Sequence, residues 1–455
     1  MKSMHFLKSQ MGTNGLRLDA SFHLSDGAST RRALARMPYS RITIGQTLSR
    51  SFYGGRDKRV YVNSPDHGIP FLGGSTMLKA DLSGVKLISK KKTPNIENTI
   101  LDSGWILVSR SGTIGKCVFS CGIHKGFAAS EHVIRLVPNN TMPSGVIYSF
   151  LASRFGYALM TQGMFGSVIQ EVEPEYIESI EIPVFPEEMQ KKVHELIIES
   201  AELWSEADYL LKTAKGKVSA YIGADSTKRN LAGVTQWSQI NSSLQVRLDA
   251  PYYINRGTSF IKNAKREMKK LEDCNVRIYR PGIFKRNYVE NGFCYIKGSE
   301  LFLRNPFSKC EHLSKTKTPF LDELTLKENQ LLFTCAGTCG QVKLITKEYE
   351  DYSAIGSQDI IRIESHDELF SYAYLFVYLQ LPIINDYIQS LKYGSVIERL
   401  EPIHVAALQI ITPNMDLVKE INTLISKYKD CIYIEFKNQE KAIRLIEEEI
   451  EKWQK

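Results

Sequence analysis

The chain lacks a hydrophobic run long enough to cross a membrane. Its longest apolar stretch, residues 372–384, is too short to span a bilayer and is interrupted by Gln380 and Pro382. Lys2 and Lys8 lie near the amino terminus, but no apolar core and cleavage site follow them, so no signal peptide is indicated. We expect a cytoplasmic protein without a membrane partner, and 455 residues leave room for two to four domains.

Cysteine is also scarce, with eight in the chain, which is too few for a disulfide scaffold. A CxxxC pair begins at Cys117 and another at Cys335, but neither is followed by a second pair at zinc-ligand spacing. We therefore expect reduced, partly buried thiols and no metal site. A metal or catalytic site built from the first pair with His124 and His132 is the alternative.

Signatures of catalysis are missing too. Asn305-Pro306-Phe307 lacks the second proline of the Asn-Pro-Pro-aromatic methyltransferase motif. The run 111–116 resembles a P-loop, but its glycine spacing is wrong and Cys117 follows the lysine. No nuclease carboxylate cluster or cofactor loop stands out, so we expect a non-catalytic chain with no cofactor of its own.

What the chain does have is a long internal repeat. Arg-Leu-Asp-Ala at 17–20 returns at 247–250, and Gly-Ser-Val-Ile at 166–169 returns at 394–397. Shorter matches between these landmarks keep the same order, at an offset of about 224 to 230 residues, far longer than a solenoid repeat. The repeat therefore indicates two copies of a whole domain, which suits a ligand with two similar halves.

A heptad pattern follows each copy. Apolar and small residues from Met189 to Ala214 are spaced alternately by four and three, and those from Val418 to Trp453 follow the same rule with one extra step of four. Pairing of the two helices is favoured over each helix lying on its own domain, in either orientation. A helix of about 30 residues would be roughly 45 Å long. The predicted parts are a domain at 1–186, a helix at 187–218, a second domain at 219–412 and a helix at 413–455.

The repeated segments have a mixed pattern that predicts an α+β fold. Short strand candidates lie at 69–72 and 293–296, and buried-strand candidates lie at 104–109 and 330–334. Glycines at 112, 115, 337 and 340 predict turns with positive φ. Helical spacing covers 148–161 and 372–390, and 262–270 has the character of a polar helix face.

Positive charge is concentrated in the repeated segments. Residues 1–186 carry 21 Lys and Arg against 13 Asp and Glu, and residues 219–412 carry 24 against 21. This distribution suits DNA or RNA bound by the globular parts. The candidate contact residues are Arg50, Arg56, Lys58, Arg59, Lys90, Lys91, Lys92 and Arg110 in the first copy, and Lys285, Arg286, Lys297, Lys315 and Lys317 in the second.

Together these motifs resemble the specificity subunit of Type I restriction–modification systems. The similarity lies in the repeated domain-entry motif, in the glycine-turn strand 107–115, in the run 129–135 and in Glu173-Pro174, and it covers nearly the whole chain. The second copy departs from the pattern at 335–336 and 358–359, as expected if the two copies bind different DNA sequences.

The resemblance implies two target-recognition domains that alternate with two long helices, which pair as an antiparallel coiled coil. It implies binding to double-stranded DNA at a bipartite, asymmetric target split by a gap. The expected partners are methyltransferase (M) subunits, which bring S-adenosylmethionine, and a restriction/translocase (R) subunit. A nucleic-acid-binding adaptor of another defence or modification complex is the alternative.

Overall fold

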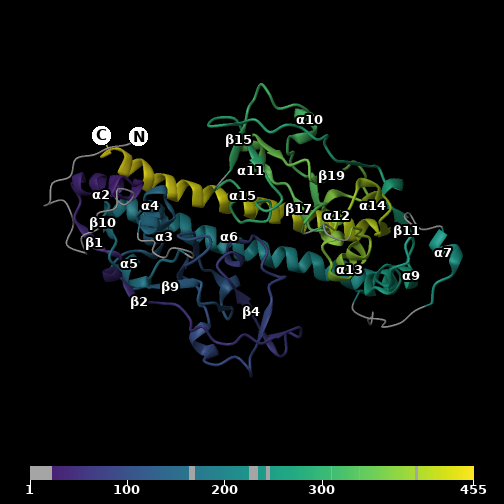
Figure 1. The fold of residues 1–455 in the computed structure, drawn as a ribbon, viewed down its shortest axis with the longest axis horizontal. Helices are drawn as coiled ribbons and strands as arrows, with labels where there is room; N and C mark the ends of the chain where they lie inside the picture. The colour runs from purple at the N-terminus through teal and green to yellow at the C-terminus, as the bar shows by residue number, and fades with distance from the viewer. Residues whose placement is uncertain are drawn as a thin grey trace. The chain divides into compact units, whose positions relative to one another are not determined.

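The computed structural model describes residues 23–162, 170–224, 234–241, 246–308, 310–337, 339–394 and 398–454. The repeated motifs at 17–20, 166–169 and 395–397 lie outside these residues. The chain forms two compact units, Met1–Ser205 with Ile434–Lys455, and Glu206–Tyr433. Each unit is described separately below (Figure 1).

The first unit contains a four-stranded antiparallel sheet in the order β2-β9-β6-β7 and a smaller sheet in the order β3-β5-β4-β8. The strands of the first sheet are β2 (Leu48–Phe52), β6 (Ile106–Ser109), β7 (Cys117–Phe119) and β9 (Val133–Pro138). Those of the second are β3 (Tyr61–Val62), β4 (Gly68–Leu72), β5 (Leu87–Ser89) and β8 (Ala128–Ala129). A further pair joins β1 (Arg41–Thr43) to β10 (Glu181–Pro183). The helices are α2 (Asp26–Arg36), α3 (Ser144–Ala152), α4 (Arg154–Gln162) and α5 (Pro174–Glu178).

The second unit repeats this topology strand for strand. Its sheets have the orders β12-β19-β16-β17 and β13-β15-β14-β18, with β11 paired to β20. The strands are β11 (Met268–Lys270), β12 (Val276–Tyr279), β13 (Tyr288–Val289), β14 (Phe293–Ile296), β15 (Glu311–Leu313), β16 (Leu331–Thr334), β17 (Val342–Leu344), β18 (Ala354–Gly356), β19 (Ile360–Ser365) and β20 (Gln409–Ile411). The helices are α7 (Trp237–Asn241), α8 (Ala250–Ile254), α9 (Arg256–Asn263), α10 (Leu321–Leu324), α11 (Lys347–Asp351), α12 (Tyr372–Leu379), α13 (Pro382–Ser390) and α14 (Pro402–Ala406). The α+β duplication predicted from the sequence is therefore confirmed.

Glycine turns close the same hairpin in both units. Gly112 and Gly115 lie between β6 and β7 with φ of 73° and 75°, and Gly337 and Gly340 lie between β16 and β17 with φ of 72° and 84°. The prediction of positive φ is therefore confirmed at all four positions. Glycine suits them because these left-handed conformations are strained for residues with a side chain.

Three helix predictions need correction. The segments 148–161 and 372–390 each fold as two short helices, interrupted near Ser153 and at Gln380-Leu381. In the second case Pro382 begins the new helix, where its missing N–H removes no helical hydrogen bond. The predicted helix face at 262–270 is also wrong, because α9 ends at Asn263 and Met268–Lys270 pairs with β20 as a strand.

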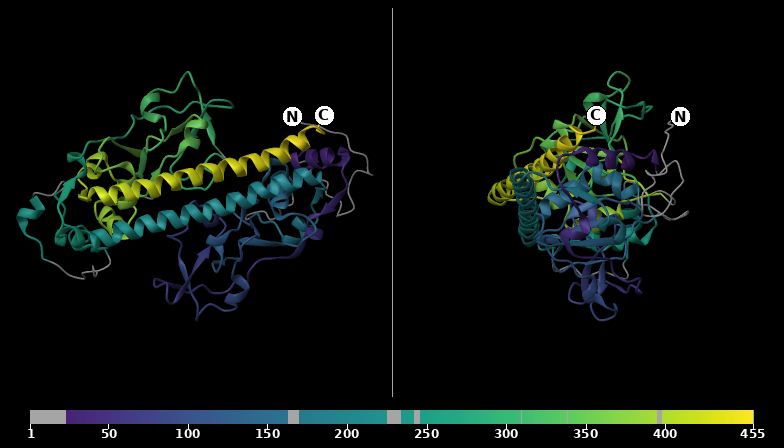
Figure 2. Two further views of the ribbon diagram at one scale, coloured as in Figure 1. Left: turned by 180° about the vertical axis from the view of Figure 1, so that it is seen from behind. Right: turned by 90° about the vertical axis from the view of Figure 1, so that its left-hand side faces the viewer.

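The two heptad segments form long helices, α6 (Glu187–Ile222) and α15 (Met415–Glu451), which lie side by side in Figures 1 and 2 and run in opposite directions. In the first unit the Ser200 hydroxyl donates to the Glu435 carboxylate at 3.3 Å, and Gln439 also donates to Ser200. In the second unit Lys217 pairs with Glu420 at 2.6 Å. The predicted pairing is thus antiparallel.

Each long helix also packs on the domain of its unit. Val193, Ile197 and Trp204 of α6 belong to the apolar core of the first unit, together with Ile446 of α15. In the second unit Ala214 and Val218 share a core with Ile421 and Ile425. Helix pairing and packing on the domain therefore occur together, rather than as alternatives.

One pair of cysteines departs from the prediction of reduced thiols. Cys294 in β14 is joined by a disulfide to Cys310, with a Cα–Cα distance of 5.6 Å. Register explains the contact, because Cys294 lies opposite His312 in the antiparallel β14–β15 pair and Cys310 directly precedes β15. The other six cysteines are free thiols.

Candidate nucleic-acid interface

Three of the predicted contact residues of the first unit lie at the same end of the β3–β5 strand pair. Lys58 and Arg59 precede β3, and Lys90 directly follows β5. Ser89 donates its N–H to the Val60 carbonyl at 2.8 Å, which places Arg59 and Lys90 at the same end of the two strands. We call Lys58, Arg59 and Lys90 the first basic end.

The second unit forms the same arrangement. Lys285 and Arg286 enter β13, Lys315 leaves β15, and Ser314 donates to the Asn287 carbonyl at 2.9 Å. We call Lys285, Arg286 and Lys315 the second basic end. Since the two ends occupy equivalent strand positions, the internal repeat places a cationic group at the same point of both domains.

Arg59 is held from two sides. Its Nη2 donates to both carboxylate oxygens of Glu131, at 2.6 and 2.5 Å, and its guanidinium lies over the ring of Phe71 at 5.2 Å. The side chain of Arg59 keeps 33% exposure, whereas that of Glu131 keeps 11%. Burial raises the pKa of Glu131, but the backbone and Arg59 hydrogen bonds outweigh it and lower the pKa overall. The carboxylate therefore stays ionised and fixes the arginine.

Arg286 has the same two kinds of neighbour. Its guanidinium lies over the ring of Tyr295 at 5.6 Å, and its Nη2 is 3.9 Å from the Asp359 carboxylate. Phe71 and Tyr295 occupy equivalent places in β4 and β14. The acid comes from the same loop in both units, one position further along in the second.

A buried arginine supports that loop in each unit. Arg135 is fully buried and donates to the carbonyls of Ser130 and Val133 at 3.1 and 2.8 Å, and also to those of Thr99 and Ala129. Arg362 is likewise buried and donates to the carbonyls of Ser357, Ile360 and Gly356 at 2.8, 2.5 and 2.8 Å. Burial lowers the pKa of each guanidinium to about 10. Both loops that carry the acidic partner are therefore fixed from within the domain, a role that the sequence-based reasoning missed.

Arg110 belongs to the interior rather than to the surface. Its side chain is 5% exposed, pairs with Glu171 at 2.7 Å and with Glu173, and lies over the Tyr53 ring at 4.4 Å. This environment leaves little of the guanidinium for a phosphate.

The second unit keeps this ion pair but supplies the arginine from another strand. Cys335 occupies the position of Arg110, and Arg280 occupies that of Tyr53. Arg280 Nη1 pairs with Glu401 at 3.0 Å, and Glu401 precedes Pro402 just as Glu173 precedes Pro174. The second copy therefore keeps an arginine next to the equivalent glutamate, but a different position in the sequence supplies that arginine.

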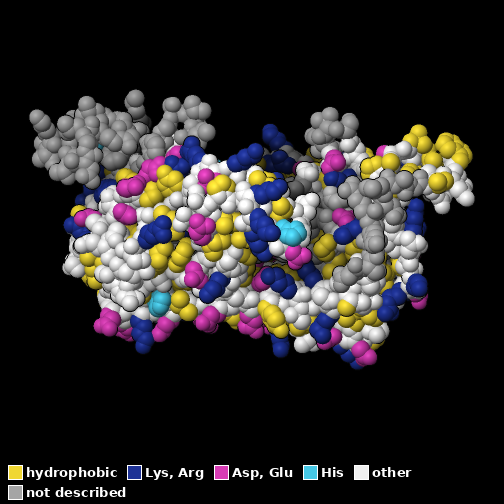
Figure 3. All heavy atoms as spheres, turned by 90° about the horizontal axis from the view of Figure 1, so that it is seen from below, with side chains coloured by type: hydrophobic (Ala, Val, Ile, Leu, Met, Phe, Trp, Pro, Cys, Tyr) yellow, Lys and Arg dark blue, Asp and Glu magenta, His cyan; other side chains and the backbone are white. Residues whose placement is uncertain are grey.

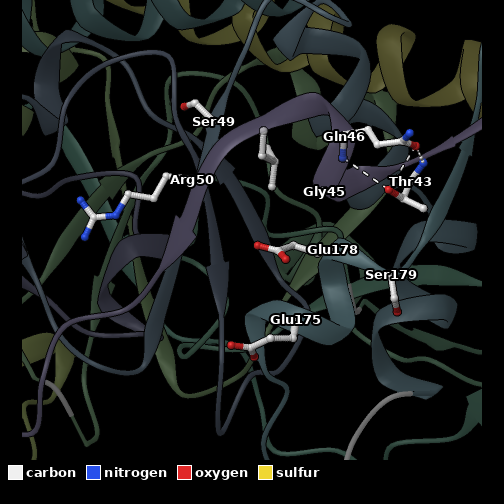
Figure 4. Close-up of a pocket in the computed structure, with 9 residues that line it drawn as sticks. Thr43, Gly45, Gln46, Ser49, Arg50, Glu175, Glu178 and Ser179 are labelled. Carbon is white, nitrogen blue, oxygen red and sulfur yellow. Dashed lines mark hydrogen bonds between the residues drawn. The ribbon is translucent and has the colours of Figure 1, made fainter. Parts of the chain in front are cut away.

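Arg50 lies apart from the basic ends. It belongs to β2, where its guanidinium covers the Phe52 ring at 3.8 Å, and it borders an open hollow that Glu175 and Glu178 also line. Figure 4 shows its side chain directed away from both carboxylates. The two acids make this hollow a poor place for a phosphate.

The remaining predicted residues fall into two groups. Lys91, Lys92 and Lys317 are exposed and follow the basic ends along the chain. Arg56 and Lys297 have acidic partners, Glu171 at 3.4 Å and Glu311 respectively. Figure 3 shows a face on which Lys and Arg alternate with Asp and Glu. Charges of both signs are therefore mixed on this face.

The model of the Type I restriction modification DNA specificity domain matches residues 54–197 and 253–444, which together are well over half of the chain. The chain belongs to this family. Members are non-catalytic DNA-recognition subunits, so the basic ends lie in domains that give a complex its DNA sequence specificity. No curated protein matches the chain.

Solved structures of similar proteins cover nearly the whole length of this specificity subunit, but their sequence identity and structural similarity to it are low. The S subunit from M. genitalium is 12% identical, with 92% of this chain and 96% of that chain covered, at a TM-score of 0.38. The HsdS subunit from Thermoanaerobacter tengcongensis is 11% identical, with 91% and 96% covered, at a TM-score of 0.28. The family assignment therefore depends on the match in sequence.

Within the described ranges of this specificity subunit, no group of three or more His, Cys, Asp and Glu side chains is placed to hold a metal ion. Cys121 and His124 interact with each other, because His124 Nδ1 accepts the Cys121 N–H at 3.1 Å, and the imidazole packs against Trp204. No helix in the described part of the chain is long and apolar enough to cross a bilayer.

Proposed function

We propose that this specificity subunit reads a bipartite, asymmetric DNA target, one short half-site for each domain, with a gap whose length matters but whose sequence does not. The observation that carries the proposal is the repeated basic end, formed at equivalent strand positions in two domains whose surrounding polar residues differ. The equivalent lysines of the two ends suit the phosphate backbone, which is the same in both half-sites, while the other polar side chains of each domain suit the base edges.

In this proposal the subunit directs M subunits and an R subunit to the target and works in the cytoplasm. The methyl donor, S-adenosylmethionine, is held by the M subunits. The paired helices α6 and α15 serve as the spacer between the two reading domains. Support comes from the family and from the continuous length of each helix, 36 and 37 residues.

The experiment is methylome sequencing of cells with and without the gene. We expect a split adenine-methylation motif that disappears when the gene is deleted and returns with a plasmid copy. A methylome that deletion leaves unchanged would refute the proposal.

Exchanging residues 1–186 for those of another family member tests whether each domain reads one half-site. One half of the motif should change and the other should stay the same. A change in both halves, or in neither, would contradict one domain reading one half-site.

A further inference from the structure

Arg59 and Arg286 differ from the lysines beside them in the kinds of neighbour that they have. Lys58 and Lys285 are exposed, Lys90 donates to the carbonyls of Pro65 and Asp66 at 3.4 and 3.3 Å, and Lys315 has an aromatic neighbour, the ring of Phe293 at 5.9 Å. Each arginine instead has an aromatic ring on one side and a carboxylate on another, in both units. A contact that only neutralises a phosphate does not require such orientation, because a flexible ammonium group can supply it.

The orientation leaves part of each guanidinium available to a ligand. A guanidinium has five N–H donors in a planar fork, and in Arg59 the hydrogen bonds to Glu131 both start from Nη2. About a third of each side chain remains exposed, 33% for Arg59 and 36% for Arg286. Nη1 and Nε of Arg59 make neither of the two bonds to Glu131, so they can donate to a ligand.

The loop next to each arginine is hydrogen-bonded from inside the domain. The acid that pairs with it lies on the loop that the buried Arg135 or Arg362 fixes through several backbone carbonyls. A chain of contacts thus runs from a buried arginine to a loop carboxylate and then to an exposed arginine. Fixing a side chain before binding reduces the entropy lost on binding and improves discrimination.

We infer that Arg59 and Arg286 are guanine-reading residues, each forming a bidentate contact with O6 and N7 of one guanine in its own half-site. The guanine edge in the major groove offers two acceptors that match the arginine fork, and no other base offers that pair. Glu131 and Asp359 act as positioning residues. The flanking lysines of each basic end contact phosphates. This inference rests on the proposed function, since it requires that each domain binds DNA.

The test uses the full chain together with its M subunits, and duplexes that carry the motif found by methylome sequencing. Arg59→Lys keeps the charge but removes the fork, and Lys58→Ala is the matched control for loss of a neighbouring charge. For the wild type, replacing the guanine that Arg59 reads should weaken binding by about tenfold to a hundredfold. In Arg59→Lys that penalty should fall to less than about threefold, while penalties at the other half-site stay unchanged.

Arg286→Lys should have the same effect at one guanine of the opposite half-site. Lys58→Ala should weaken binding to all duplexes alike and leave every penalty in place. The inference is overturned if Arg59→Lys and Arg286→Lys retain every single-base penalty, or if they weaken all duplexes equally. Those outcomes leave the proposed function intact, whereas the absence of any split motif would refute the proposed function itself.

Discussion

Single residues show how the two copies preserve a contact while changing the residues that make it. Arg110 meets Glu173 in the first unit, and Arg280 meets Glu401 in the second, although the two arginines come from different strands. Read along the sequence, the replacement of Arg110 by Cys335 looks like the loss of a DNA contact. The structure shows instead that this partly exposed carboxylate has an arginine partner in both units, which comes from the end of β6 in the first unit and from the end of β12 in the second.

This exchange predicts a rescue in the first unit. Arg110→Cys should destabilise the folded state by about 3 kcal/mol, because Glu171 and Glu173 lose a largely buried cation. Adding Tyr53→Arg, which copies the arrangement of the second unit, should restore at least half of the loss. Urea denaturation of the two single variants and the double variant measures the coupling. If the effects of the two substitutions simply add, the exchange does not operate.

The Arg59–Glu131 pair predicts a pH dependence with a definite sign. The pKa of Glu131 is lowered from its ordinary value of 4.5, so the pair stabilises the fold fully above that value and the contribution disappears as pH falls through the lowered pKa. Glu131→Gln should cost about 1 kcal/mol at pH 7, discounted because Arg59 is partly exposed.

Below the lowered pKa the stabilities of wild type and Glu131→Gln should converge, which thermal denaturation from pH 7 to pH 3 would reveal. The control is Glu97→Gln at an exposed position, which should follow the wild type throughout. A constant difference between Glu131→Gln and wild type across this range would contradict the prediction.

At the scale of elements, the sequence predicts those features that depend on local pattern. Buried strands, positive-φ glycines and the two heptad helices all have strong local signals, and the structure confirms them. The helix breaks at Ser153 and Gln380 have weaker signals, since apolar spacing continues across them. Strand register has no such signal, so the sequence could not show that Arg59 and Lys90 lie at the same end of a strand pair or that Cys294 is bonded to Cys310.

The disulfide between β14 and the residue before β15 predicts a difference between the units. It closes a loop of 16 residues, and its removal should destabilise the second unit by about 3 kcal/mol. Reduction should therefore speed hydrogen exchange in β14 and β15 but not in the equivalent β4 and β5, and the double variant Cys294→Ser/Cys310→Ser should not respond to reductant.

Thiol titration of the unreduced, denatured chain provides the direct check. Six free thiols are expected. A count of eight would contradict the bond and restore the prediction of reduced cysteines made from the sequence.

At the scale of the whole molecule, the net charge of +8 has a smaller role than its placement. Many basic residues have acidic partners, including Arg56, Arg110 and Lys297. The exposed lysines of the two basic ends are Lys58, Lys90, Lys285 and Lys315. These side chains, rather than the total charge, should set how strongly salt weakens DNA binding.

The salt dependence can be predicted from their number. Each phosphate contact contributes about −0.9 to the slope of log affinity against log salt concentration. Lys58→Ala/Lys90→Ala should therefore make the slope shallower by about 1.8, and Lys285→Ala/Lys315→Ala by the same amount, without altering the preferred sequence. Lys191→Ala/Lys452→Ala, at exposed positions in α6 and directly after α15, should leave the slope unchanged. Phosphates are common to every sequence, so loss of a phosphate contact should not change which bases are preferred. A shift in base preference in either basic-end variant would show that these lysines contact bases, and that specificity does not depend on the two arginines alone.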